Sequence, residues 1–395
     1  MKILIADKLS DKAVAELQKL GGQVTFNPDL TADNLPDAID DHEILIVRST
    51  KVTAQTIDAA PSLSLIIRAG AGVDTINLEK ASSKGIHVAN CPAKNTDAVA
   101  ELAIGLLIAA DRRIVDASAD LRAGAWKKKE YSKACGLKGR TLGVVGLGSI
   151  GKAVVKIARG LEMEVIAWSK SLTVETAEKL AIGYCSTLEE LAEKSDAVTV
   201  HLAANKETHH IINDKFFGKM KKGAIFINTS RGDVVDTAAL KKAISAKQLA
   251  VGLDVFEDEP NSVMGDFGDQ ELAQKITCTP HIGASTDQAS EAIAQSVVDI
   301  VKSYKDSGKP LNVVNIREKT VAKITLVVRH YNRVGVLAGV LDELRNADIN
   351  IEEMENRIFA GGQSASCSLL LDDVPSSEVL EKIKENENII QVMLK

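Results

Sequence analysis

The stretch TLGVVGLGSIGKAV, residues 141–154, decides the fold. An apolar run that predicts a buried strand leads into Gly146-x-Gly148-x-x-Gly151, and a helical pattern starts at once. In this context the first glycine permits a tight turn, and the second lets the backbone approach a pyrophosphate at the helix N-terminus. The spacing therefore predicts a dinucleotide-binding βαβ unit rather than an ordinary glycine-rich turn.

Short apolar runs alternate with helical patterns on both sides of this loop. Before it stand KILIAD, EILIVRS, LSLIIRAG and GIHVANCP, and after it stand EVIAWS, AVTVHLA, AIFINTS, LAVGLDVF and ITCTPH. This rhythm predicts two doubly wound α/β domains, Rossmann-like and flavodoxin-like, each with a parallel sheet. Long helices at about 95–123 and 286–305 are expected to cross between them, the first opened by capping residues Asn95-Thr96-Asp97.

The tail has a different pattern. Its runs predict the order βαββαβ, a ferredoxin-like module of a size typical for a domain. Gly308 and Pro310 mark the connection before it. The predicted organisation is a substrate-binding domain at 1–95 and 284–311, a dinucleotide-binding domain at 96–283, a linker at 312–321 and the tail module at 322–395.

Composition excludes several classes. The net charge of −6 and the absence of long basic runs argue against nucleic-acid binding. The longest apolar stretch, AVAELAIGLLIAA at 98–110, contains Glu101 and is too short to span a membrane. Five scattered cysteines without a CxxC motif fit reduced thiols in a cytoplasmic protein. The pair His209-His210 has no supporting ligands nearby, so no metal site is predicted.

Three polar residues each follow a predicted strand: Arg231, Glu259 and His281. In open α/β sheets such positions lie at the carboxyl edge, where ligands bind. A guanidinium binds a carboxylate with two hydrogen bonds, and histidine near neutral pH accepts a hydroxyl proton. A carboxylate bonded to the imidazole would orient it and keep its pKa high. Singly each residue fits a structural role, but together they predict dehydrogenation of a 2-hydroxy acid.

The strand after the glycine loop ends in WSKS, and an acidic residue usually stands there to hold the ribose of NAD. Ser169 occupies this position, and Lys170 follows. Ser169 can make one ribose hydrogen bond and does not repel a 2′-phosphate, which Lys170 could attract. The expected cofactor is NAD, with NADP left open. The alternative reading of Lys170 is a solvated surface residue.

VGLGSIG, NTSRGDVVD, DVFEDEP and TPHIGAS resemble signatures of the D-isomer-specific 2-hydroxyacid dehydrogenases, and RAGAGVD at 68–74 resembles that family's substrate loop. The resemblance covers nearly the whole chain and makes Arg231, Glu259 and His281 the catalytic set. HLAAN at 201–205 departs from the family, which normally has a proline two residues after the histidine.

The resemblance also implies binding residues. For the substrate these are Arg48, Gly70, Ala71, Arg231 and His281. For the cofactor they are Gly146, Gly148, Ser149, Ile150, Gly151, Ser169, Thr229, Ser230, Arg231, Asp254, His281, Ile282, Gly283 and Ala284, with Asp254 near the nicotinamide amide. Independently of the resemblance, the sequence offers Lys51 and Arg68 as further cations for a substrate phosphate, with a structural salt bridge as the alternative role of Arg68.

The tail resembles an ACT domain, a sensor module common in amino-acid metabolism. His330 and Asn332, expected in its first loop, and Asn350 match serine-contacting positions of family members that carry this module. Val334 stands where the family usually has a proline, and a module that only dimerises is the alternative. L-serine is therefore the expected effector, and a homodimer or homotetramer is the expected assembly.

The implied activity is NAD-dependent oxidation of D-3-phosphoglycerate to 3-phosphohydroxypyruvate at the entry to L-serine synthesis. One alternative is another 2-hydroxyacid reductase, acting on glyoxylate, hydroxypyruvate or 2-oxoglutarate. The other is a nucleotide-sensing corepressor on the same fold.

Overall fold

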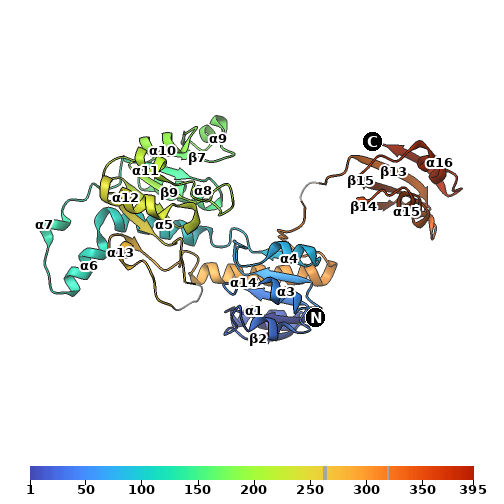
Figure 1. Cartoon of the computed structure of the whole chain (residues 1–395), viewed down its shortest axis with the longest axis horizontal. Helices are drawn as coiled ribbons and strands as arrows, with labels where there is room; N and C mark the ends of the chain where they lie inside the picture. The colour runs from blue at the N-terminus through green and yellow to red at the C-terminus, as the bar shows by residue number, and fades with distance from the viewer. Residues whose placement is uncertain (261–264, 318–319) are drawn as a thin grey trace. The chain divides into compact units, whose positions relative to one another are not determined.

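The computed structural model describes residues 1–260, 265–317 and 320–395 (Figure 1). The chain divides into two compact units, Met1–Asn315 and Ile316–Lys395. Residues 318 and 319 of the predicted linker lie outside the described residues. Its first residues belong to the first unit, because the Val314 N–H donates to the Val88 carbonyl at 2.8 Å. The domain boundaries within the first unit stay predictions.

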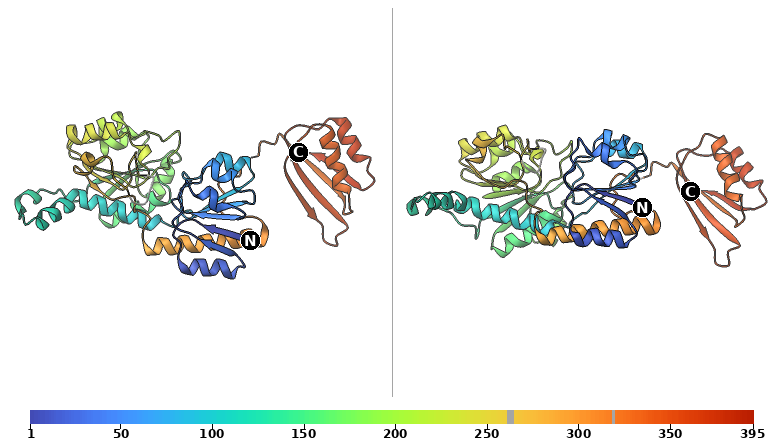
Figure 2. Two further views of the ribbon diagram at one scale, coloured as in Figure 1. Left: turned by 60° about the horizontal axis from the view of Figure 1, so that its bottom comes forward. Right: turned by 90° about the horizontal axis from the view of Figure 1, so that it is seen from below.

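The first sheet has five parallel strands in the order β2-β1-β3-β4-β5, the flavodoxin-like order. The strands are β1 (Lys2–Ile5), β2 (Gln23–Phe26), β3 (Ile44–Val47), β4 (Leu65–Arg68) and β5 (His87–Asn90). Helices α1 (Asp11–Lys19) and α14 (Asp287–Ser307) pack side by side on one face (Figure 2). Helices α2 (Leu35–Ile39), α3 (Ala54–Asp58) and α4 (Leu78–Ser83) cover the other face. β3 is buried at every position, as expected for a parallel strand covered on both faces.

The second sheet has seven parallel strands in the order β12-β11-β10-β9-β6-β7-β8. They are β6 (Thr141–Val145), β7 (Glu164–Trp168), β8 (Gly183–Tyr184), β9 (Ala197–Val200), β10 (Ile225–Asn228), β11 (Ala250–Leu253) and β12 (Thr277–Cys278). The order reverses between β6 and β9, which is the point where ligands bind in doubly wound sheets. In this sheet the short β8 lacks a counterpart among the predicted strands, as does β2 in the first sheet.

Helices cover both faces of this sheet. On one face lie α5 (Thr96–Arg112), α8 (Ser149–Gly160) and α9 (Val174–Lys179). On the other lie α10 (Leu188–Lys194), α11 (Asp214–Lys219), α12 (Thr237–Lys247) and α13 (Gln270–Ala273). The 3-10 turn η1 (Gly232–Val234) follows β10.

The single long helix expected over 95–123 is wrong. Arg113 adopts a left-handed conformation with φ of 50° and separates α5 from α6 (Ile114–Arg122), and α7 (Lys128–Tyr131) follows. The Arg113 side chain pairs with Asp116 at 3.1 Å and Glu130 at 3.2 Å, which offsets the cost of this backbone. Asn95 does precede α5, but its side chain makes no capping hydrogen bond.

The second unit confirms the βαββαβ prediction. Its antiparallel sheet has the strand order β14-β15-β13-β16. Its elements follow one another along the chain as βαββαβ, as in the ferredoxin-like fold. The strands are β13 (Ile324–Tyr331), β14 (Ile351–Ile358), β15 (Ser364–Leu371) and β16 (Ile389–Leu394). Helices α15 (Val336–Asn346) and α16 (Ser377–Lys384) pack on one face through Val340, Leu344 and Ile383. The predicted fold class, two doubly wound α/β sheets and a ferredoxin-like module, is confirmed.

Candidate active site

The glycine loop joins β6 to α8 and has the geometry that a pyrophosphate needs. Gly146 has φ of +94°, and a Cβ there would lie 2.5 Å from the carbonyl oxygen of His201. A Cβ on Gly151 would collide with the Gly146 carbonyl, so helix and loop pack too closely for any side chain. Around Gly148, by contrast, no described atom lies within 4 Å of an added Cβ. The backbone there is open to a ligand, as a dinucleotide requires.

The N-terminus of α8 faces this opening. Ser149 and Ile150 begin the helix, and the N-cap residue Gly148 supplies no side-chain hydrogen bond to its first turn. The first N–H groups of the helix are thus available to an anion, and the helix dipole favours one there. The predicted dinucleotide loop fits the cofactor on these two grounds.

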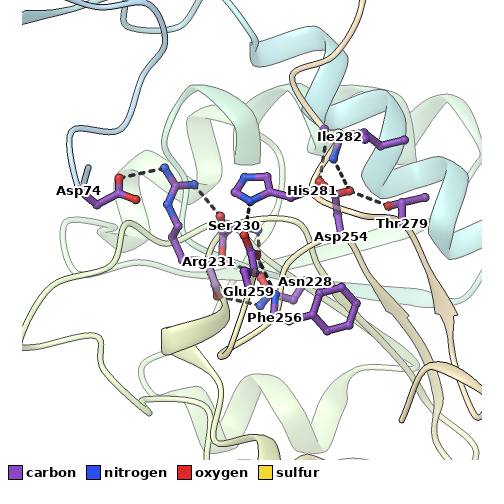
Figure 3. Close-up of polar contacts among 11 residues, drawn as sticks. Asp74, Asn228, Ser230, Arg231, Asp254, Phe256, Glu259, Thr279, His281 and Ile282 are labelled. Atoms are coloured by element: carbon purple, nitrogen blue, oxygen red, sulfur yellow. Dashed lines mark hydrogen bonds and ion pairs between the residues drawn. The ribbon is translucent and has the colours of Figure 1, made fainter. Parts of the chain in front are cut away.

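Arg231 follows β10 and is held by its neighbours (Figure 3). The Asn228 side-chain amide donates to the Arg231 carbonyl at 2.9 Å, and the Asn228 oxygen accepts the N–H of Ser230 at 3.0 Å. One Arg231 nitrogen donates to the Ser230 carbonyl at 2.7 Å, and another pairs with Asp74 at 3.4 Å. Arg231 therefore reaches from the second sheet to the loop after β4, which carries Gly72 and Asp74.

Glu259 and His281 form a pair. Nδ1 of His281 lies 2.7 Å from Oε2 of Glu259, while Oε1 accepts the Phe256 N–H at 2.9 Å. Burial acts to raise the pKa of Glu259. The hydrogen bonds from His281 and Phe256 and the charges of His281 and Arg231 outweigh burial, so this pKa lies below its usual range. The carboxylate is thus ionised at neutral pH.

His281 is held in a rare backbone conformation. Its φ is 51°, and its N–H donates to the carbonyls of Asp254 at 2.8 Å and Thr279 at 3.1 Å. A left-handed conformation in a residue other than glycine costs energy and is found most often at functional sites. Here it turns the imidazole toward Glu259 (Figure 3).

Asp254 shapes the loop that presents His281. Its carboxylate accepts the Thr279 hydroxyl at 2.6 Å and the N–H groups of Ile282 and Gly283 at 2.8 Å each. Burial raises the pKa of Asp254, against these hydrogen bonds. Its contact with a nicotinamide amide stays a prediction. The role visible in the structure is to hold Thr279, Ile282 and Gly283 in place.

Cations gather where the first sheet meets Arg231. Burial lowers the pKa of Arg68, and the positive charges of Arg231 and Arg48 lower it further. Asp74 lies near Arg231 and Arg68, whose charges outweigh burial and lower the pKa of Asp74. A Cβ on Gly70 would collide with the Arg68 guanidinium, so this loop lies directly against it. Gly70 and Ala71 are fixed by hydrogen bonds to Cys91 and Asn90, of 2.9 Å and 2.6 Å.

Unpartnered polar atoms lie at or after the ends of strands in both sheets. Within the described parts of the chain, four buried side-chain atoms have no hydrogen-bond partner: Arg68 Nε, Thr75 Oγ1, His201 Nδ1 and Thr229 Oγ1. Buried polar groups are normally satisfied, so such groups indicate a missing ligand or water. Thr229 was predicted as a cofactor residue and Arg68 as a cation for a phosphate. Asp74, Thr75 and His201 were missed, although Asp74 lies within the quoted RAGAGVD segment.

Lys170 and the two adjacent histidines lie near the surface. The Lys170 side chain is 81% exposed, in agreement with the surface alternative, and its Nζ lies 2.6 Å from Oε2 of Glu207. The rings of His209 and His210 stack with their centroids 4.0 Å apart, and His210 has a left-handed backbone with φ of 50°. Among the described residues, no group of three or more histidine, cysteine, aspartate or glutamate side chains could hold a metal ion.

The structure does not bring the three predicted effector residues together. His330 lies within β13 rather than in the loop after it, is 2% exposed, and bonds the Tyr331 carbonyl and Asn356. Asn332 follows the end of β13. Asn350 precedes β14. The first residue of β14, Ile351, and the first residue of β13, Ile324, both pair with Leu371 of β15, so β13 and β14 begin at the same end of the sheet. Asn332 and Asn350 therefore lie at opposite ends of the sheet, about 25 Å apart at strand spacing.

These features together define a dinucleotide-dependent oxidoreductase site: a pyrophosphate loop, a carboxylate–imidazole pair and a guanidinium. Comparisons with known proteins agree. Residues 104–283 match the NAD-binding domain of the D-isomer-specific 2-hydroxyacid dehydrogenases. A D-3-phosphoglycerate dehydrogenase of Methanocaldococcus jannaschii is 36% identical over 365 residues, 91% of this chain and 68% of that relative. A glyoxylate reductase of Thermococcus litoralis is 41% identical over 274 residues, 67% of this chain and 81% of the relative.

A solved structure resembles most of the chain as well. The NAD⁺-bound 3-phosphoglycerate dehydrogenase of Entamoeba histolytica has a TM-score of 0.67 at 27% identity, over 80% of this chain and 99% of that one. The chain belongs to the D-isomer-specific 2-hydroxyacid dehydrogenase family, and it is an oxidoreductase that uses a nicotinamide dinucleotide. It spans 59% and 64% of the length of further, longer D-3-phosphoglycerate dehydrogenases. No helix in the described parts of the chain has the length and apolarity needed to cross a membrane.

Proposed function

We propose that the protein oxidises D-3-phosphoglycerate to 3-phosphohydroxypyruvate with NAD⁺. The observation that carries this proposal is the gathering of three cations, Arg48, Arg68 and Arg231. The charges of Arg231 and Arg48 act on Arg68 against that of the Asp74 carboxylate, so positive charge is in excess around Arg68. Arg231 also acts on the charge of Glu259, so the cations adjoin the Glu259–His281 pair. A substrate with a carboxylate and a phosphate would neutralise this excess.

The roles of the side chains follow from their chemistry. Arg231 binds the substrate carboxylate, and Arg48 and Arg68 bind the phosphate. Nε2 of His281 removes the proton of the C2 hydroxyl as the C2–H hydride leaves, and the C–O bond becomes a carbonyl. Glu259 stabilises the imidazolium formed by this transfer. NAD⁺, when bound, accepts the hydride. In the reverse direction the same imidazolium returns its proton to the carbonyl oxygen.

The regulatory part of the proposal rests on the second unit. Its ferredoxin-like topology supports an ACT domain, and we propose L-serine as its inhibitor. Since Asn332 and Asn350 lie at opposite ends of one sheet, we propose that a serine site forms between two copies of this unit. This requires a homodimer or homotetramer. The exposed Met354 and Ile358 on β14 support such pairing at the sheet edge. The proposed setting is the cytoplasm.

Substrate profiles test the proposal. Rates with 3-phosphohydroxypyruvate, hydroxypyruvate and glyoxylate are compared in the parent protein, in Arg48→Ala and in the control Arg345→Ala, an exposed arginine of the second unit. Arg48→Ala is expected to raise KM for the phosphorylated substrate at least about tenfold more than for hydroxypyruvate, as loss of a charged contact does. Equal effects, or preference of the parent for glyoxylate, would overturn the phosphate assignment.

A further inference from the structure

The strand that usually carries the ribose-binding acid ends without one. β7 stops at Trp168, and Ser169 and Lys170 follow. The Gly146 N–H donates to the Trp168 carbonyl at 2.8 Å, so the end of β7 is joined directly to the glycine loop. The Leu172 N–H returns to the Ser169 carbonyl at 3.0 Å and closes a turn. Lys170 is therefore carried by an ordered turn beside the loop expected to bind the pyrophosphate.

A carboxylate reaches this place from another strand. Glu207 lies in the loop after β9, and Asn205 fixes that loop. Oδ1 of Asn205 accepts the N–H groups of Glu207 at 2.9 Å and Thr208 at 3.1 Å. The Thr208 hydroxyl donates to the Ala203 carbonyl at 2.7 Å. These hydrogen bonds hold the backbone of Glu207 in place without using its side chain.

The two side chains meet across the glycine loop. β7 and β9 are the two neighbours of β6, so their ends flank the loop that follows β6, about 10 Å apart at normal strand spacing. Lys170 Nζ and Glu207 Oε2 lie 2.6 Å apart. The bond to Lys170 lowers the pKa of Glu207. An ionised carboxylate thus lies against the ammonium group of Lys170, the residue that follows the position of the missing acid.

We propose that Glu207 gives this protein its preference for NAD over NADP. Its carboxylate takes the place of the acid absent at Ser169 and accepts a hydrogen bond from the 2′-hydroxyl of the adenosine ribose. It also neutralises Lys170, the one side chain at the turn that would attract a 2′-phosphate. The inference depends on the proposed function in one respect, which is that the protein binds a nicotinamide dinucleotide. It does not depend on which hydroxy acid is the substrate.

The Lys170–Glu207 ion pair differs from other surface ion pairs in its position, not in its strength. Lys179 and Glu175 are also 2.6 Å apart and equally exposed, but both lie on α9 within one helical turn. Exposed pairs of this kind contribute little to stability. Lys170 and Glu207 come instead from the two segments that flank the cofactor loop, where a charge decides which ligand is accepted.

Equilibrium titration tests the proposal without any substrate. NADH and NADPH fluorescence is followed for the parent protein, Glu207→Gln, Lys170→Ala with Glu207→Gln, and the matched control Glu175→Gln. We expect the parent to bind NADH more tightly, and Glu207→Gln to bind NADPH about tenfold more tightly than the parent does while losing NADH affinity several-fold. In the double variant the gain for NADPH should disappear, because Lys170 is then absent. Glu175→Gln should match the parent.

Two results would overturn the inference. One is a parent protein that binds NADPH more tightly than NADH. The other is a Glu207→Gln protein whose ratio of NADPH to NADH dissociation constants equals that of Glu175→Gln. Because binding is measured without a hydroxy acid, a wrong substrate assignment leaves this result readable. Failure of the proposed function would show as binding of NADH without turnover of the phosphorylated substrate.

Discussion

Oε2 of Glu259 lies 2.7 Å from Nδ1 of His281, and this contact decides the tautomer of the neutral ring. Glu259 is ionised, because its pKa is held below the usual range, and an ionised carboxylate can only accept a hydrogen bond. Nδ1 therefore carries the proton. In the neutral ring, Nε2 is left with its lone pair, which is the form that a general base requires.

Replacement of the base should abolish most turnover without unfolding the protein. His281→Asn is the informative variant, because asparagine tolerates the left-handed backbone found at this position. We expect kcat to fall by about 10²–10⁴-fold, as for loss of a general base, with a melting temperature close to that of the parent. Steady-state rates and thermal melts measure both. A kcat within a factor of about three of the parent would assign the proton transfer elsewhere.

Gly72 should be essential for the substrate but not for the cofactor. A Cβ at this position would collide with Arg231 and lie 2.5 Å from the Asp74 carboxylate. Both groups are ends of flexible side chains, so Gly72→Ala should fold and displace the guanidinium. We expect KM to rise at least about tenfold with the NADH dissociation constant unchanged. Gly218→Ala, on α11 with open space around it, is the control. Equal KM values in the two variants would contradict the role of Arg231.

His210 should position the loop that carries Glu259. His210 Nε2 lies 2.6 Å from Oε1 of Glu257, and Oε2 of Glu257 accepts the Thr237 N–H at 3.3 Å. Glu257 stands on the same loop as Glu259, so loss of this anchor should misplace the Glu259–His281 pair. We expect His210→Ala to lower kcat by up to about 10²-fold and leave cofactor affinity unchanged.

The conservative variant separates positioning from a general loss of structure. His210→Gln keeps a donor for Glu257 and should recover most of kcat. If both variants reduce kcat and the melting temperature together, His210 has only a structural role.

The sequence alone predicts the buried strands, from their apolar runs, and the residues of the active site, from their positions after the strand ends. Buried runs such as ILIV at 44–47 predict parallel strands, because both faces of such a strand are covered. Arg231, Glu259 and His281 were predicted to share a cleft because parallel strands end at one edge, and the structure brings them together.

Other features depend on contacts that no local pattern encodes. The pair Lys170–Glu207 joins two loops that are neighbours only after the sheet order reverses. The break at Arg113 lies within a continuous helical pattern, and side-chain partners stabilise its left-handed backbone. His330 lies next to a turn in sequence, but β13 continues through it because β15 pairs with it. In each case a tertiary contact overrides the local preference.

His201 should make the first unit less stable in mild acid. Its Nε2 contacts the Thr199 hydroxyl at 2.9 Å, its Nδ1 is buried, and burial lowers its pKa to about 4. An unfolded histidine binds a proton near pH 6.5, so between these values the unfolded chain binds more protons and stability falls as pH falls. From pH 7 to pH 5 this amounts to about 2 kcal/mol.

Urea unfolding of the parent protein and His201→Gln, followed by tryptophan fluorescence, measures this difference. Both tryptophans, Trp126 and Trp168, lie in the first unit, so the signal reports on that unit alone. The free energy of unfolding of the parent should decline more steeply with acid than that of the variant, and the two lines should run parallel above pH 7. Parallel lines over the whole range would mean that His201 binds a proton as readily in the folded protein as in the unfolded chain, because only then does folding leave its proton affinity unchanged.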